Sequence, residues 1–308
     1  MVDVLHGAAS VDPPLDGSVV TLGAFDGVHL GHQALIRRAV DAAKQLGVPS
    51  VGYTFYPHPA KIIAPTMAPK LLVSIERRAA LMRAAGLDHV LVEPFDAAFA
   101  QVTADAFVAN YLVRALHPRH VVVGFNFFYG HKRGGDTNHL KASGAKHGFE
   151  VEVVEPVESG TVVASSTAIR EYLLEGNVAA AHTLLGRDFA LAGTVVEGDK
   201  RGRTIGFPTA NLSPDSELLP ANGVYATRVR YEGALHDAVT NVGVRPTFDG
   251  TRPTVETFLL DWSGDLYGRL IEVDFVARLR DERRFDGIDA LKAQLARDVD
   301  AARAALGA

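Results

Sequence analysis

The chain has 308 residues, 47% of them hydrophobic and 22% charged, which is the composition of a soluble globular protein long enough for two domains. A net charge of −5 argues against a nucleic-acid surface, and the lack of cysteine excludes disulfides, thiolate catalysis and cysteine-bound zinc. We expect no membrane partner and no signal peptide, because no apolar run approaches about 20 residues and the first residues lack a basic segment. These features suit a cytoplasmic protein.

Strand and helix signals alternate through the first 186 residues. Apolar β-branched runs such as 120–124 suit strands that are buried on both faces of a sheet. The alternation predicts an α/β domain over 1–186, with a parallel sheet wrapped by helices. We expect strands at 19–25, 50–55, 89–92, 119–125 and 149–154, and helices at 33–46, 75–85, 104–116, 138–147 and 168–174.

The pattern changes near Gly186. From there strand-like runs are separated by turn clusters, and no stretch with helical periodicity interrupts them before 276. This pattern predicts an antiparallel sandwich or small barrel over 187–308 that ends in a helix. We expect its strands at 191–197, 223–231, 238–242, 254–260 and 270–275, and its helix at 288–306.

Two histidines three residues apart open the first expected helix, in the segment GAFDGVHLGH at 23–32. His29 and His32 should lie on one face of the first turn, close to its unpaired N–H groups. A helix N-terminus already favours anions, so two imidazole donors there predict a phosphate site. Gly31 would let a phosphate or a base approach the backbone. A glycine-rich turn with two surface histidines is the alternative interpretation.

Two further segments of the first domain follow expected strands. Asn126 directly follows the strand expected at 119–125, and Ser165-Ser166-Thr167-Ala168-Ile169-Arg170 opens the helix expected at 168. Hydroxyls before a helix usually cap it, but with Arg170 they also form a phosphate cradle. Asn126 alone is more often a turn residue. No G-x-G and no Gly-Lys pair occurs, so neither a dinucleotide fingerprint nor a Walker A loop is available.

The second domain carries a glycine-rich run, GDKRGRTIGFPTAN, at 198–211. Glycines let backbone N–H groups reach phosphates. Thr209 and Asn211 offer hard oxygen ligands two residues apart, which suit Mg²⁺ bound to ATP. A long glycine-rich loop is the alternative. Basic pairs such as Lys132-Arg133 could also meet a nucleotide.

These motifs resemble known families. The segment 23–32 is similar to the H-x-G-H motif of nucleotidyltransferases, in the form found in prokaryotic FAD synthetases, where P-H-P, G-x-N-F and S-S-T-x-I-R pieces follow in the order seen here. The run at 198–211 resembles the riboflavin kinase signature. The resemblance to bifunctional riboflavin kinase/FAD synthetases covers nearly the whole chain. One departure is Tyr129, which precedes Gly130 where the family pattern has phenylalanine.

The resemblance implies a Rossmann-like nucleotidyltransferase domain, which adenylylates FMN to FAD, followed by a β-barrel kinase domain, which phosphorylates riboflavin to FMN. ATP, riboflavin, FMN and FAD would be the partners, and Mg²⁺ would arrive with ATP. His29 and His32 would hold the α-phosphate, Asn126 would orient the nucleotide, and Arg170 with Ser166 and Thr167 would hold the pyrophosphate. Glu256 would be the kinase base, with Thr209 and Asn211 on the metal. Further ATP contacts are expected at Gly23, Phe25, Gly31, Gly198, Gly202, Arg203 and Gly206.

Two other functions remain open. An enzyme of the same fold could adenylylate a different phosphate acceptor, such as phosphopantetheine, although a kinase signature in the same chain favours FMN. A flavin-sensing module could have kept the fold and lost turnover, although every expected catalytic position is filled. Product analysis with ATP, Mg²⁺ and riboflavin distinguishes the three.

Overall fold

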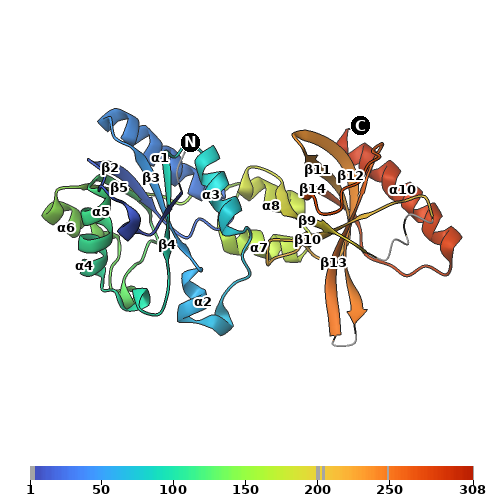
Figure 1. Ribbon diagram of the computed structural model, residues 1–308, viewed down its shortest axis with the longest axis horizontal. Helices are drawn as coiled ribbons and strands as arrows, with labels where there is room; N and C mark the ends of the chain where they lie inside the picture. The colour runs from blue at the N-terminus through green and yellow to red at the C-terminus, as the bar shows by residue number, and fades with distance from the viewer. Residues whose placement is uncertain (1–3, 199–201, 203–204, 248–249, 308) are drawn as a thin grey trace. The chain divides into compact units, whose positions relative to one another are not determined.

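A computed structural model of the chain describes residues 4–198, 202, 205–247 and 250–307. The residues form two compact units, Met1–Lys70 with Ser74–Ala164, and Leu71–Val73 with Ser165–Ala308. The first unit is built on a parallel sheet and the second on a closed antiparallel barrel (Figure 1).

Six parallel strands form the sheet of the first unit, in the order β1-β4-β3-β2-β5-β6. The order reverses at β2, which lies between β3 and β5. In parallel sheets such a switch point is where ligands bind, beyond the carboxyl ends of the strands. The strands are β1 (Val4–His6), β2 (Ser18–Leu22), β3 (Ser50–Tyr56), β4 (His89–Pro94), β5 (Pro118–Gly124) and β6 (Glu150–Val154), with a separate hairpin of β7 (Glu158–Ser159) and β8 (Val162–Val163).

Helices cover both faces of this sheet, because alternate strand residues enter two different cores. Val20 and Val121 pack with the helical segment 104–116 and with α6 (Thr137–His147). Val19 and Val122 pack with α1 (Leu30–Leu46) and α3 (Ile75–Ala84) on the other face. Each strand is therefore apolar on both sides, as expected for a parallel sheet. The helices are α1 (Leu30–Leu46), α2 (Pro59–Ile63), α3 (Ile75–Ala84), α4 (Ala104–Phe107), the π-helical η4 (Val108–Val113), α5 (Arg114–Leu116) and α6 (Thr137–His147), with short 3₁₀ turns η1 (Ala8–Ser10), η2 (Pro65–Met67), η3 (Phe99–Gln101) and η5 (His131–Arg133).

The second unit begins with two helices and continues into the barrel. Its strands close in the order β10-β13-β12-β11-β14-β9, and every neighbouring pair is antiparallel. The elements are α7 (Ser166–Leu174), α8 (Val178–Leu185), β9 (Phe189–Val196), β10 (Ala210–Pro214), β11 (Gly223–Tyr231), β12 (Ala234–Thr247), β13 (Gly250–Leu259), β14 (Leu270–Arg280) and α10 (Ile288–Leu306).

The two faces of the barrel wall have different chemistry. Thr227, Thr240 and Thr257 are fully buried, and their hydroxyls form a chain with O···O distances of 2.8 and 3.0 Å. The opposite face of the same strands packs on α10, where Ala302 and Leu306 meet an apolar cluster of the barrel. Side chains alternate between these faces along each strand. Glu256, next to Thr257, therefore points to the α10 side.

The expected fold class of each part is confirmed, including the barrel and its terminal helix. The sequence patterns missed β1, α2, α8, β10, the β7–β8 hairpin and the short 3₁₀ turns. The compact units divide between Ala164 and Ser165, so α7 and α8 group with the barrel. The functional boundary at Gly186 stays a prediction.

Candidate active sites

The H-x-G-H segment follows β2 and opens α1, which begins at Leu30 and so three residues before the expected start at 33. Its loop is tightly constrained, since Phe25 and Val28 have positive φ angles of 50° and 43° and are buried. Backbone strain of this kind persists only where the surrounding structure holds it, and it gathers at functional sites. The side chain of Gln33 donates to the Val28 carbonyl at 2.9 Å and so ties the loop to α1.

The two histidines stack on each other at the helix start. His29 is the N-cap of α1, where its Nδ1 accepts a hydrogen bond from the His32 backbone N–H at 3.4 Å. The ring centroids lie 3.6 Å apart, and Phe25 packs at 5.2 Å from the His32 ring. A Cβ on Gly31 would lie 3.1 Å from the His29 ring, so glycine makes room for this stack. In a neutral imidazole whose Nδ1 accepts this bond, the proton is on Nε2.

Asn126 lies two residues beyond β5, the strand next to β2. Because parallel neighbours end at the same edge of a sheet, Asn126 and the histidine segment belong to the same edge of the first unit. Its side chain is exposed. Gly124 precedes it, and a Cβ there would lie 3.5 Å from the Asn126 Oδ1.

A large aromatic cavity of about 770 Å³ opens beside Asn126, and the sequence patterns did not predict it. It is lined by side chains from β3, α2, η3, α4 and the loop after β5, most of them apolar. Phe55, Phe95 and Phe99 pack edge to face or tilted around one side, with centroids 5.3 to 6.0 Å apart. The only sequence signal was the number of aromatic residues between 53 and 129, which the pattern did not assign to one place.

Ser166, Thr167 and Arg170 lie in the first turns of α7, as expected, with Ser165 as the N-cap. The Ser165 hydroxyl accepts from the Ala168 N–H at 3.2 Å. This helix belongs to the second compact unit, whereas His29, His32 and Asn126 belong to the first. That the two groups meet on one nucleotide stays a prediction.

In the barrel, three polar residues on neighbouring strands lie side by side. Glu256 on β13 is directly opposite Asn211 on β10 and Asn241 on β12. Directly opposed residues of antiparallel strands have Cβ atoms only about 5 Å apart. The expected base and one of the expected metal ligands are therefore neighbours, although 45 residues separate them in the sequence.

The glycine-rich run packs against these ligands. A Cβ on Gly198 would overlap the amide of Asn211, and one on Gly202 would overlap the Phe207 carbonyl. Gly206 has a φ of 88°, which favours glycine. Arg203 lies outside the described residues.

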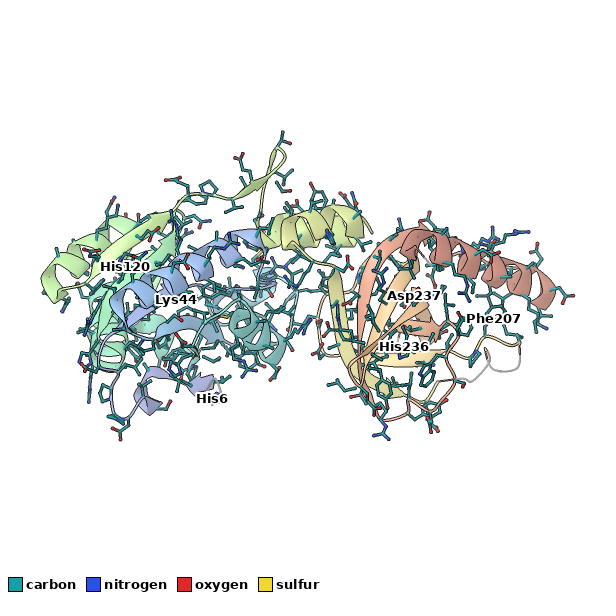
Figure 2. The ribbon with its side chains drawn as sticks, turned by 90° about the horizontal axis from the view of Figure 1, so that it is seen from above. His6, Lys44, His120, Phe207, His236 and Asp237 are labelled. Carbon is teal, nitrogen blue, oxygen red and sulfur yellow. The ribbon has the colours of Figure 1, made fainter. Side chains whose placement is uncertain are left out.

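Two cavities meet at Thr209. One, of about 360 Å³, lies between the barrel and α10 and contains Glu256 and Asn241 among apolar side chains, namely Ile205, Phe207, Val224, Val239, Phe258, Phe285, Leu291, Leu295 and Val299. Figure 2 labels Phe207 beside α10. The other, of about 290 Å³, is lined by Pro208, Trp262 and Tyr267.

An ion pair and hydrogen bonds fix α10 beside the cavity of about 360 Å³. The Arg280 guanidinium donates to both oxygens of Asp298, at 2.9 and 2.7 Å, and Asp298 is only 3% exposed. Gln294 donates to the same carboxylate at 2.7 Å and accepts from Arg283. Bidentate pairs of this kind fix orientation strongly.

Within the described residues, no helix is long and apolar enough to cross a membrane. In the same parts of the chain, no cluster of three histidine or acidic residues could hold a metal ion by itself.

Comparison with known proteins divides the chain in the same order as its motifs. A family model described as FAD synthetase matches residues 12–168, and one described as riboflavin kinase matches residues 185–306. A bifunctional riboflavin kinase/FMN adenylyltransferase of Escherichia coli is 40% identical over 96% of this chain and 94% of its own length. The protein of that description from Pseudomonas fluorescens is 40% identical over 98% and 97%.

A solved structure described as a macrolide-efflux protein from Streptococcus pneumoniae is also similar. It has a TM-score of 0.89 and 34% identity, covering 98% of this chain and 99% of that one. Its fold is therefore shared with this chain. The two family models and the full-length relatives agree, and the chain belongs to the family of bifunctional riboflavin kinases/FMN adenylyltransferases.

Proposed function

We propose how this chain carries out the two reactions of its family. The part that matches FAD synthetase transfers AMP from ATP to FMN, giving FAD and pyrophosphate, and the part that matches riboflavin kinase transfers the ATP γ-phosphoryl group to riboflavin. The observation that best supports the kinase assignment is that Thr209 lines two cavities, one of which is also lined by Glu256. Two substrates bound in those cavities would meet at the residues expected to act on them.

In the kinase reaction, the apolar cavity under α10 takes the flavin ring, and its ribityl 5′-hydroxyl lies at Glu256. The carboxylate accepts the hydroxyl proton as the oxygen attacks the γ-phosphorus and ADP leaves. The adenine ring of ATP stacks between Trp262 and Tyr267 in the second cavity. Phosphoryl transfer has a loose transition state, so orientation of the hydroxyl matters as much as removal of its proton.

Thr209 and Asn211 fit a hard divalent cation, and we propose Mg²⁺. Their oxygens are of the type that Mg²⁺ prefers, and the opposed Glu256 adds negative charge. When bound, the cation would neutralise charge on the ATP phosphates.

In adenylyl transfer, an FMN phosphate oxygen attacks the α-phosphorus of ATP, and pyrophosphate leaves. His29 and His32 donate to the charge that develops there, at a helix N-terminus that already favours anions. Gly23, Phe25 and Gly31 shape the nucleotide site. We assign Asn126 to substrate orientation, and Ser166, Thr167 and Arg170 to the pyrophosphate.

The aromatic cavity beside Asn126 fits the isoalloxazine ring of FMN. Its volume of about 770 Å³ is in the range of small-molecule sites, and its phenylalanine rings offer faces and edges for stacking.

The net charge of −5 supports a function without a nucleic-acid partner. We also expect no membrane partner, and we expect the protein to act in the cytoplasm.

Separation of products tests the proposal directly. The protein is incubated with ATP, Mg²⁺ and riboflavin, and in parallel with FMN or with phosphopantetheine in place of riboflavin. We expect FMN and then FAD from riboflavin, FAD from FMN, and no adenylylated phosphopantetheine. Tight flavin binding without any product would instead indicate a sensor, and adenylylated phosphopantetheine would indicate a different acceptor.

A further inference from the structure

The loop from Tyr129 to Gly135 forms a closed, basic rim at the mouth of the aromatic cavity. Tyr129 and Gly135 exchange two backbone hydrogen bonds, each 3.0 Å long, which close the loop into a small hairpin. Between them His131, Lys132 and Arg133 are three basic residues in a row, and all three line the cavity. None of the residues expected to be catalytic lies in this loop, so the proposed reactions do not explain it.

The backbone of this loop is held in an unfavourable conformation. Lys132 and Arg133 have φ angles of 51° and 59°, which residues other than glycine rarely adopt. Gly130 has a φ of 73°, and a Cβ there would lie 2.6 Å from the Ala104 nitrogen. Such strain costs on the order of 1–3 kcal/mol per residue and is kept where the neighbours fix it, often at ligand-binding loops.

Several contacts fix the loop from outside. The Tyr129 hydroxyl lies 2.8 Å from the His139 Nδ1, and the His139 Nε2 lies 3.4 Å from Asp105. The His131 backbone N–H donates to the Val102 carbonyl at 2.7 Å, and its Nδ1 lies 3.0 Å from the Ala100 carbonyl. The hydroxyl by which Tyr129 departs from the family pattern is therefore an anchor of this loop.

The charges of the loop are available to a ligand. Lys132 and Arg133 are exposed, and within the described residues neither forms an ion pair. Arg133 instead lies over the Phe128 ring, with its guanidinium carbon 4.0 Å from the ring centroid. The nearby acidic groups are engaged elsewhere, because Asp136 accepts from the His139 N–H at 2.8 Å and Asp105 pairs with the His139 ring.

We propose that Lys132 and Arg133 bind the phosphate of FMN and so select phosphorylated flavin over the unphosphorylated ring in the adenylyltransferase site. An apolar cavity with a cationic mouth is complementary to an aromatic ring that carries a phosphate dianion. Asn126 lines the same cavity, so a phosphate held at the mouth is close to the edge of the sheet that bears the reacting groups. The inference rests on the proposed adenylyl transfer to FMN.

The double variant Lys132→Gln/Arg133→Gln tests this role in the full chain. Glutamine is also an L-residue with a long side chain, so the backbone cost at both positions is retained. We expect KM for FMN in FAD formation to rise at least about tenfold, as loss of charge-assisted contacts predicts, with kcat within about threefold of the parent. Lumiflavin, which has the ring without the ribityl phosphate, should inhibit with an unchanged constant.

The matched control is Lys141→Gln/Lys146→Gln, which removes the same charge from α6 and touches none of the cavity lining. It should leave KM for FMN unchanged, and both variants should keep the riboflavin kinase rate. An unchanged KM for FMN, an equal weakening of lumiflavin, or a rise in KM for ATP alone would each overturn the proposal. Absence of FAD formation by the parent chain would instead overturn the proposed function.

Discussion

At the scale of single residues, both candidate sites combine a pattern visible in the sequence with a partner that only the fold supplies. The stacking of His29 on His32 follows from their spacing of three at a helix start. The pairing of Glu256 with Asn211 follows from strand register, which no short segment encodes. Local spacing is thus legible in a sequence, whereas register between distant strands is not.

His29 has two roles that a suitable substitution can separate. Its Nδ1 caps α1, and its Nε2 is proposed to donate to the α-phosphate. Asparagine is a good N-cap, so His29→Asn should keep the helix start while removing the imidazole. Loss of one donor to developing charge typically costs about 10²–10³ in rate. We expect FAD formation from FMN to fall by that factor in a coupled assay, with riboflavin phosphorylation near normal. Equal loss of both activities in a folded variant would contradict the assignment.

Glu256→Gln addresses the kinase site. The two side chains have the same shape, so the cavity and the neighbouring Asn211 should be preserved. A positioned base is typically worth about 10²–10⁴ in rate. FMN formation from riboflavin should fall within that range, while FMN supplied from outside is still converted to FAD. An undiminished kinase rate would place the base elsewhere.

At the scale of elements, the sequence patterns located the long, strongly patterned helices and strands and missed short or uniform ones. β1 has three residues, and β10 carries Asn211 and Pro214, which are unfavourable in strands. The α8 sequence VAAAHTLL is apolar almost throughout and so lacks a clear helical periodicity. The aromatic cavity was missed because its lining comes from many segments between 55 and 133.

The pair of strands β11 and β14 carries a buried carboxyl group that should make stability depend on pH. Asp274 is 4% exposed, and burial raises its pKa from 3.8 to about 6, although Arg230 pairs with it at 2.6 Å. A raised pKa means that the native state binds the proton more tightly than the unfolded state. Protonated Asp274 therefore stabilises the folded state, fully below about pH 4, and this stabilisation is lost as the pH rises through about 6.

Asp274→Asn removes this proton-binding group. Between pH 7 and pH 5 the parent should gain about 1 kcal/mol in unfolding free energy relative to the variant, as two pKa values near 4 and 6 imply. Urea denaturation of both proteins at the two pH values measures the difference. If both proteins respond equally to pH, Asp274 is not the group responsible.

At the scale of the whole molecule, two ways of dividing the chain place α7 and α8 differently. The family models match residues 12–168 and 185–306. The gap between the two matches contains most of α7 and nearly all of α8. The compact second unit includes both helices. Within it α8 packs on β9 and β14, and the Ala221 N–H donates to the Leu173 carbonyl of α7 at 2.8 Å. The change of pattern at Gly186 marks where strands begin, which need not be where a stable unit begins.

Two fragments distinguish these divisions. Residues 187–308 and residues 165–308 both contain Thr209, Asn211 and Glu256 and every side chain that lines the cavity under α10, so both should phosphorylate riboflavin without the rest of the chain. Only the longer fragment keeps α8, which packs on β9 and β14, and α7, which packs on α8. We expect its thermal midpoint to be at least about 5 °C higher, since about 1 kcal/mol shifts the midpoint of a domain of this size by several degrees. Circular dichroism would establish folding before activity is measured. A folded 187–308 fragment of equal stability would show that α7 and α8 contribute nothing to the barrel, and a folded 165–308 fragment without kinase activity would mean that the first 164 residues complete the kinase site.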